Sequence, residues 1–250
     1  MVDTHCHLDS CKPPDSELVE NARAAGVSHL ATVGMHDESI QRALAAAHEF
    51  DDVVAIVGRH PHYTEGFGDA DLEAIERAAQ DPRARAIGET GLDYFRDHAP
   101  REDQRRAFEA QIDLAARSGL ALVIHTREAE EDTFALLRDR AAELTVILHC
   151  FSAPGRIDEC VERGYMCSFA GNVTYPKAVE LQAAARDVPE ELLLVETDSP
   201  YLAPQPVRGK PNEPANVVAT AEFVAELRGM GYEALDAAVE RNAARVFGDW

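Results

Sequence analysis

The chain alternates short apolar runs with longer amphipathic segments, and this repeat limits its fold more than any other feature. Short runs rich in valine, isoleucine and leucine predict buried strands, whereas apolar residues at helical spacing predict helices. The strands are expected from near Met1 and at 27–33, 53–58, 84–88, 120–124, 145–148, 165–169 and 192–195; the helices at 15–25, 37–49, 69–80, 101–118, 128–140, 154–163, 176–186, 214–228 and 232–247. Eight strand–helix repeats predict an α/β protein, a (β/α)8 TIM barrel that forms a single domain over residues 1–250. An open, doubly wound sheet is the alternative, since a sequence does not show whether the edge strands meet.

Histidines and carboxylates stand at the ends of these predicted strands. His5 and His7 are expected to project from one face of the first strand, because strand side chains alternate with period two. The strand ends of an α/β barrel meet at one mouth. The side chains expected there are His5, His7, Glu89, His125, His149 and Asp198. One histidine at a strand end is an ordinary polar residue, but six candidate ligands at the same end predict a metal site.

Six ligands are too many for one tetrahedral ion and suit two divalent ions that lie ~3.5–4 Å apart. Glu89 is the expected bridge, which leaves His5, His7 and Asp198 for one ion and His125 and His149 for the other. Mixed imidazole and carboxylate ligands favour Zn, Mn, Fe or Co, although Mg can enter a carboxylate-rich half-site. Paired ions activate water, so the pattern predicts a hydrolase with Glu89 and Asp198 as catalytic residues, and with Asp198 as proton acceptor.

A few cationic or hydrogen-bonding residues accompany the predicted mouth. His62 follows the third strand, Arg127 lies just beyond His125, and Arg208 and Lys210 follow Asp198. Arginine binds phosphate in bidentate fashion, so these four residues are candidate substrate contacts. The alternative is that Arg127 pairs locally and that 208–210 is a solvated loop.

The overall charge is strongly acidic, with a formal net charge of −21. Such a surface repels itself and repels anions, and molar salt screens the repulsion by shortening the Debye length to ~3 Å. We therefore expect a salt-adapted protein, with an ordinary acidic enzyme as the alternative. Five cysteines without paired spacing indicate free thiols in a reducing cytoplasm. A strand that starts at Met1 leaves no room for a signal peptide, no apolar run suits a membrane, and no obligate protein partner is evident.

Seven motifs, in order along the whole chain, resemble those of the TatD-type metal-dependent deoxyribonucleases of the amidohydrolase-like superfamily. They are Asp3-Thr4-His5-Cys6-His7-Leu8-Asp9, Gly58-Arg59-His60-Pro61-His62, Gly88-Glu89-Thr90-Gly91-Leu92-Asp93-Tyr94, His125-Thr126-Arg127-Glu128-Ala129, His149-Cys150-Phe151-Ser152, Glu196-Thr197-Asp198-Ser199-Pro200-Tyr201-Leu202 and Asn212-Glu213-Pro214-Ala215-Asn216. The resemblance implies a TIM-barrel hydrolase with the same six metal ligands. It also implies metal-dependent hydrolysis of DNA, often from the 3′ end.

Other substrates for the predicted site remain open. One alternative is a small-molecule hydrolase that acts on amides, lactones or phosphotriesters, and another is an esterase for nucleic-acid-linked substrates such as mischarged tRNA. A metal-binding barrel without catalysis is a further alternative. The acidic surface disfavours binding of a long duplex, which needs many basic contacts. The end of a DNA strand held by two metals needs few such contacts, so single strands or ends are the expected substrates.

Overall fold

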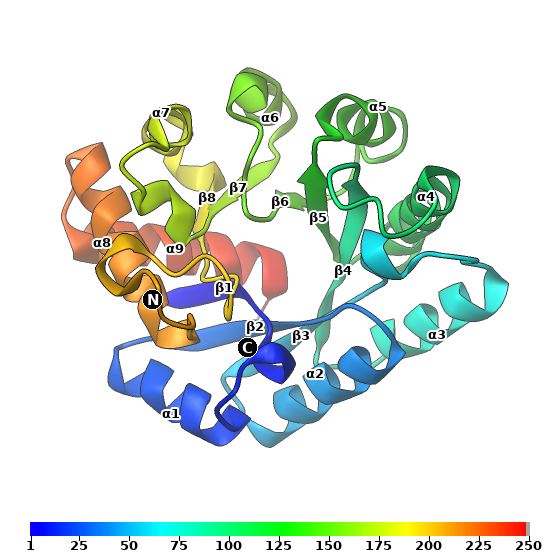
Figure 1. Ribbon diagram of the computed structural model, residues 1–250, viewed down its shortest axis with the longest axis horizontal. Helices are drawn as coiled ribbons and strands as arrows, with labels where there is room; N and C mark the ends of the chain where they lie inside the picture. The colour runs from blue at the N-terminus through cyan, green and yellow to red at the C-terminus, as the bar shows by residue number, and fades with distance from the viewer. Residues whose placement is uncertain (249–250) are drawn as a thin grey trace.

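The computed structural model describes residues 1–248, and the last two residues of the predicted 1–250 domain lie outside this range. Eight parallel strands follow one another in the order β1 to β8, with helices around the outside (Figure 1). The strands are β1 Val2–Cys6, β2 His29–Gly34, β3 Val53–Val57, β4 Ala84–Asp93, β5 Ala121–Arg127, β6 Val146–Leu148, β7 Met166–Phe169 and β8 Leu193–Val195. This confirms the predicted (β/α)8 barrel.

The helices lie close to the predicted positions. They are α1 Asp15–Ala24, α2 Asp37–Glu49, α3 Asp69–Ala79, α4 Arg101–Ser118, α5 Glu130–Arg140, α6 Ile157–Arg163, α7 Val179–Asp187, α8 Val217–Arg228 and α9 Tyr232–Phe247. The proline-led starts at Pro154 and Pro214 form separate 3-10 turns ahead of α6 and α8. Among residues 1–248, no helix combines the length and the apolar character needed to cross a bilayer.

The two edge strands meet beyond the end of β8. The backbone N–H of Asp198 donates to the carbonyl of His5 at 2.9 Å, and the N–H of His7 donates to the carbonyl of Ser199 at 2.9 Å. A doubly wound sheet would instead reverse its strand order and keep two free edges. The sequential order and these bonds exclude that alternative, and they bring the first motif of the chain beside the Asp198 motif.

The core is formed by strands that are apolar on both faces. All five residues of β3, Val53 to Val57, are fully buried because one face points into the barrel and the other packs on helices. In α2 the buried residues Ile40, Ala43, Leu44 and Ala47 recur at helical spacing and form the stripe that faces the sheet.

Two strands run further than the sequence predicts. The fourth was expected to end at Gly88, but β4 continues to Asp93, so Glu89 lies within the strand. The fifth was expected to end before His125, but β5 continues to Arg127. Polar side chains support the added part of β4: Gln111 Nε2 donates to Thr90 Oγ1 at 2.6 Å, and Gln104 Oε1 accepts from the N–H of Asp93 at 2.9 Å.

Strand pairing is irregular where candidate ligands lie. The register shifts between Asp3 and Cys6 in β1, around His5, and between Ile87 and Thr90 in β4, around Glu89. Irregularities of this kind redirect side chains locally. His7 lies just past the end of β1, so simple alternation along a strand accounts for only part of the shared direction of His5 and His7.

Gly91 is required where β4 approaches β5. Its φ is +140°, and a Cβ at this position would overlap the carbonyl of His125. We expect Gly91→Ala to lower the free energy of unfolding by more than about 3 kcal/mol, measured by urea denaturation, because backbone strain and overlap add. Gly119→Ala is the matched control. Gly119 has φ +68°, so an alanine there is also strained, but no atom lies within 4 Å of the added Cβ. Equal losses in the two variants would contradict the proposed overlap.

Candidate metal centre

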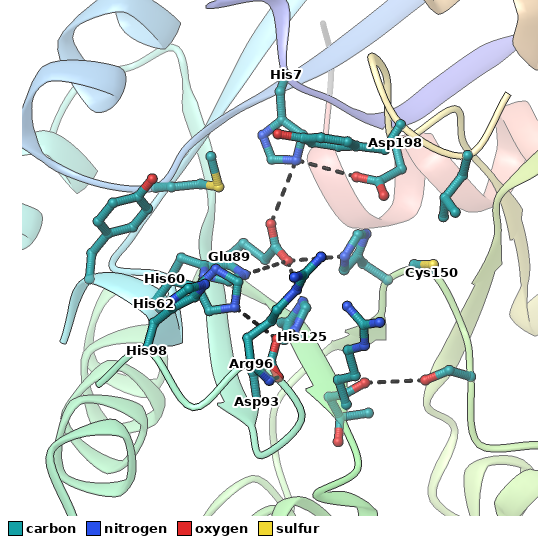
Figure 2. Close-up of a pocket in the computed structure, with 18 of the residues that line it drawn as sticks. His7, His60, His62, Glu89, Asp93, Arg96, His98, His125, Cys150 and Asp198 are labelled. Carbon is teal, nitrogen blue, oxygen red and sulfur yellow. Dashed lines mark hydrogen bonds and ion pairs between the residues drawn. The ribbon is translucent and has the colours of Figure 1, made fainter. Parts of the chain in front are cut away.

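Glu89 lies at the centre of the barrel mouth, buried among histidines (Figure 2). Its two carboxylate oxygens face different groups of imidazoles. Oε2 lies 3.4 Å from His5 Nε2 and 3.8 Å from His7 Nε2. Oε1 lies 2.8 Å from His125 Nδ1, 3.0 Å from His149 Nε2 and 3.4 Å from His60 Nε2. The geometry therefore divides the imidazoles into two groups that share one carboxylate.

Asp198 extends the group on the Oε2 side. Its Oδ1 lies 3.3 Å from His7 Nε2, and the side chain is 13% exposed. The backbone of Asp198 has φ +53°, which is uncommon for a residue other than glycine. The bond from its N–H to His5 fixes that conformation. A strained residue held in place beside a ligand cluster is typical of a functional site.

The buried histidines fit a metal ion. Both ring nitrogens of His5 and Nδ1 of His7 are buried with no hydrogen-bond partner among the described residues. Candidate ligand atoms lie within 4.8 Å of one another in His5, His7 and Glu89, and likewise in His60, Glu89 and His125. An unpartnered buried nitrogen costs free energy that a bound cation would recover. The donor set is therefore compatible with a divalent ion on each side of Glu89.

Neighbouring charges and burial shift the pKa values of the cluster in opposite directions. Burial raises the pKa of Glu89, but the imidazoles of His149 and His60 outweigh it and hold the pKa well below the usual range. Burial lowers the pKa of His149, but Glu89 and Glu196 raise it well above its usual value. Burial lowers the pKa of His60 to about 4, so this imidazole is neutral at pH 7 and free to act as a ligand.

Two carboxylates contact the imidazole nitrogens that face away from Glu89. Neither carboxylate was among the predicted site residues. Glu196 Oε1 accepts from His149 Nδ1 at 2.9 Å and from the N–H of Cys150 at 2.8 Å. Asp93 Oδ2 lies 3.2 Å from His125 Nε2. Such carboxylates fix the tautomer and the direction of ligating histidines. Glu196 also shares a possible ligand group with His5 and His149, but its bonds on the outer side of His149 favour an orienting role.

His60 is a third residue without a predicted role. It lies three residues after β3 in the His-Pro-His segment, whose second histidine, His62, was predicted to contact substrate. Its position after a strand is the signal that could have identified it, because it is the same signal that identified His149. The structure brings both histidines of the segment to the mouth, where His62 Nε2 lies 2.8 Å from Asp93 Oδ2.

The predicted phosphate contacts divide into two pairs. His62 and Arg127 line the cavity at the mouth, which has a volume of about 650 Å³. Arg208 and Lys210 do not line it: Arg208 stacks on the ring of Tyr175 at 3.9 Å, and both side chains are exposed. Arg96, in the loop after β4, lines the cavity although it was not predicted.

Glu196→Gln is expected to weaken metal binding by about 10- to 100-fold, because the neutral amide holds His149 less firmly. Competition with a fluorescent chelator measures this affinity. Glu191→Gln, at an exposed glutamate five residues earlier, is the control and should leave it unchanged. Unchanged metal affinity in Glu196→Gln would contradict the orienting role.

A barrel whose mouth gathers imidazoles around a buried carboxylate, with orienting carboxylates behind them, belongs to the class of metal-dependent hydrolases. Comparisons with known proteins agree. The model of the family described as TatD-related DNase matches residues 2–248. This chain belongs to the TatD-related DNase family.

Relatives and solved structures cover nearly the whole chain. An uncharacterised metal-dependent hydrolase, TatD of Mycobacterium tuberculosis, is 41% identical over 99% of this chain and 98% of its own. A protein of Klebsiella pneumoniae named 3′-5′ ssDNA/RNA exonuclease TatD is 34% identical, over 93% of this chain and 91% of its own. The crystal structure of the TatD homologue YJJV from Escherichia coli superposes with a TM-score of 0.92, at 29% identity, over 99% of this chain and 97% of that one. The protein is therefore a metal-dependent hydrolase.

Proposed function

We propose that this hydrolase removes nucleotides from the 3′ end of single-stranded DNA with the help of two divalent metal ions. The observation that carries the proposal is the division of ligands around Glu89, whose Oε2 and Oε1 face separate groups of imidazoles. The name of the Klebsiella pneumoniae relative supports the substrate class and the polarity. The donor set suits Zn, Mn, Fe or Co, and Mg in the half with Asp198.

The six predicted ligands divide between the two proposed ions. His5, His7 and Asp198 would hold one ion, His125 and His149 the other, and Glu89 both. His60 is an additional candidate on the second side, because it shares a possible ligand group with Glu89 and His125. When bound, the two ions would supply an activated water and a clamp on the phosphoryl oxygens.

Asp198 is the proposed proton acceptor. Burial raises the pKa of Asp198, but the hydrogen bond with His7 and the positive charge of His149 lower it by a larger amount. The pKa therefore lies below its usual value, and the carboxylate is ionised at neutral pH. The water oxygen would form a bond to phosphorus while the bond from phosphorus to the 3′ oxygen of the preceding nucleotide breaks. The proton of the water passes to the carboxylate of Asp198, and the leaving oxygen takes a proton from solvent.

Cationic side chains at the cavity wall are positioned to hold the phosphate. Arg127 and Arg96 line the cavity with His62, which Asp93 fixes. Guanidinium groups bind phosphate oxygens through paired hydrogen bonds. Arg208 and Lys210 lie outside this wall, so any contact they make would be with a more distant part of the strand. The cavity, at about 650 Å³, falls in the range of sites for nucleotide-sized ligands.

The decisive assay uses metal-loaded protein and 5′-labelled substrates: single-stranded DNA, blunt duplex DNA, RNA and an aminoacyl ester. The proposal predicts a ladder that shortens from the 3′ end of single-stranded DNA, with much slower cleavage of the duplex. Hydrolysis of the ester alone would overturn the proposal in favour of an esterase. Each substrate is tested with every candidate metal at low and at molar salt, because ionic conditions alter nucleic-acid binding.

We also propose that the protein works in a cytoplasm of high salt. The acidic surface, with a net charge of −21, supports this proposal. Raising potassium chloride from about 0.05 to 2 M should raise the melting temperature by more than about 10 °C, because screening of several kcal/mol of repulsion corresponds to such a shift. A melting temperature independent of salt would indicate an ordinary acidic enzyme.

A further inference from the structure

Exposed aromatic side chains gather at the mouth of the barrel. Among residues 1–248, the large apolar side chains with high exposure are Tyr63 at 47%, Phe95 at 50%, Val161 at 40%, Val179 at 66% and Tyr201 at 53%. Tyr63 and Tyr201 line the cavity, and Phe95 lies against the guanidinium of Arg127, which also lines it. Two of the three aromatic side chains of this set therefore line the cavity of the metal centre, and the third contacts an arginine that lines it. Half-exposed rings contribute little to the core. The shared location of these rings therefore indicates a ligand-binding surface.

The two tyrosines stand beside opposite halves of the metal centre. The ring of Tyr201 lies 6.1 Å from that of His7 at 71°, and the ring of Tyr63 lies 6.4 Å from that of His60 at 66°. These edge contacts leave part of each ring open to the cavity.

The backbone holds both tyrosines in fixed positions. The N–H of Tyr201 donates to the carbonyl of Asp198 at 2.8 Å, and its carbonyl accepts from Asn212 Nδ2 at 2.7 Å. The N–H of Tyr63 donates to the carbonyl of His60 at 2.8 Å. The backbone of each tyrosine is thereby tied to a residue of the metal centre. A rigid aromatic ring binds a planar ligand at low entropic cost.

Another part of the cavity lining combines aromatic surface with positive charge. The guanidinium of Arg127 lies 3.9 Å from the centre of the Phe95 ring, and that of Arg96 lies 5.7 Å from it. Stacking holds Arg127 flat while its N–H groups remain available to an anion. The cavity is therefore lined by both tyrosine rings and arginine guanidinium groups, which match the bases and the phosphates of one nucleic-acid strand.

We propose that Tyr201 and Tyr63 bind the bases at the unpaired end of the strand by stacking, while Arg127 and Arg96 contact its phosphates. The proposal rests on the proposed nuclease function and names the residues that select unpaired ends. Bases paired in a duplex cannot turn onto these rings. Stacking contributes affinity without charge, which suits a protein of net charge −21 that would otherwise repel the strand.

The test compares two single-stranded oligonucleotides that differ only in the 3′-terminal base, which is adenine in one and absent in the other. The last linkage is a non-hydrolysable phosphonate, and binding to metal-loaded protein is measured by fluorescence anisotropy. Loss of one stacked base costs about tenfold in affinity. We expect Tyr201→Ala to weaken binding of the adenine-ended strand about tenfold and to change binding of the abasic strand less than about twofold. Tyr201→Phe should bind both strands as the wild type does.

Tyr63→Ala is tested in the same way, and the exposed Val179→Ala serves as the control that should change neither affinity. Equal losses on the two strands for both tyrosine variants would overturn the proposal, because neither ring would then stack on the terminal base. Cleavage of single-stranded DNA by the wild type without any dependence on the terminal base would refute the stacking role alone. A base-dependent loss in a protein that cleaves no nucleic acid would refute the nuclease function alone.

Salt provides a second readout. Each phosphate contact adds about −0.7 to the slope of log affinity against log salt for a single strand. Arg127→Ala should therefore reduce the slope, whereas Tyr201→Ala should lower the affinity at every salt concentration and leave the slope unchanged. A reduced slope in Tyr201→Ala would contradict stacking.

Discussion

Glu89→Gln is expected to remove metal binding and turnover together, with kcat/KM falling by at least about 10³-fold. Both oxygens of Glu89 face imidazoles, Oε2 toward His5 and Oε1 toward His125 and His149. A glutamine offers one weak oxygen donor and an amide group that cannot bind a cation. Both halves of the site should therefore lose affinity, even though the substitution changes only one residue.

Metal content after dialysis and kcat/KM on single-stranded DNA measure the effect of Glu89→Gln. Glu180→Gln is the control, because this exposed glutamate lies at the start of α7, outside the ligand cluster. It should retain full metal content and activity. Retention of two ions by Glu89→Gln would show that Glu89 is not the bridge.

Asp198→Asn is expected to leave a folded barrel with kcat lower by about 10²- to 10⁴-fold, the usual contribution of a general base. Asparagine keeps the shape of the side chain and tolerates the positive φ, but it cannot accept the proton of the attacking water. The loss should persist when metal is saturating, which separates proton transfer from weaker ion binding.

Asp97→Asn is a closely matched control for Asp198→Asn. Asp97 also has φ +53°, but it lies in an exposed loop where it pairs with Arg101 at 3.3 Å. Circular dichroism verifies the fold of both variants, and steady-state kinetics on single-stranded DNA gives kcat. If Asp198→Asn keeps most of its activity, the proton acceptor lies elsewhere.

The order of strands and helices could be predicted because each element has its own apolar pattern. Helices α2, α4 and α9 begin and end at the predicted residues. The extension of β4 could not be predicted, since Gly91 and Asp93 are typical of a loop. The strand continues because Gln104 and Gln111 of α4 form buried hydrogen bonds with Asp93 and Thr90. The apolar pattern does not predict this part of β4 because it contains residues of the site as well as residues of the core.

The six candidate ligands were predictable from their positions at strand ends, and the structure brings them together around Glu89. Orienting residues were harder to predict, because Asp93 and Glu196 acquire their roles only through contacts with His125 and His149. The positions of Arg208 and Lys210 depend on the path of a long loop after β8, and sequence spacing does not determine that path. Their phosphate contacts stay a prediction.

The central claim is that one shared carboxylate and five further side chains hold two cations. Crystals of the manganese-loaded protein, measured at the manganese absorption edge, test it most directly. We expect two anomalous peaks about 3.5–4 Å apart, one beside Glu89 Oε2 with His5, His7 and Asp198, and one beside Oε1 with His125 and His149. A single peak, or peaks away from Glu89, would contradict the claim.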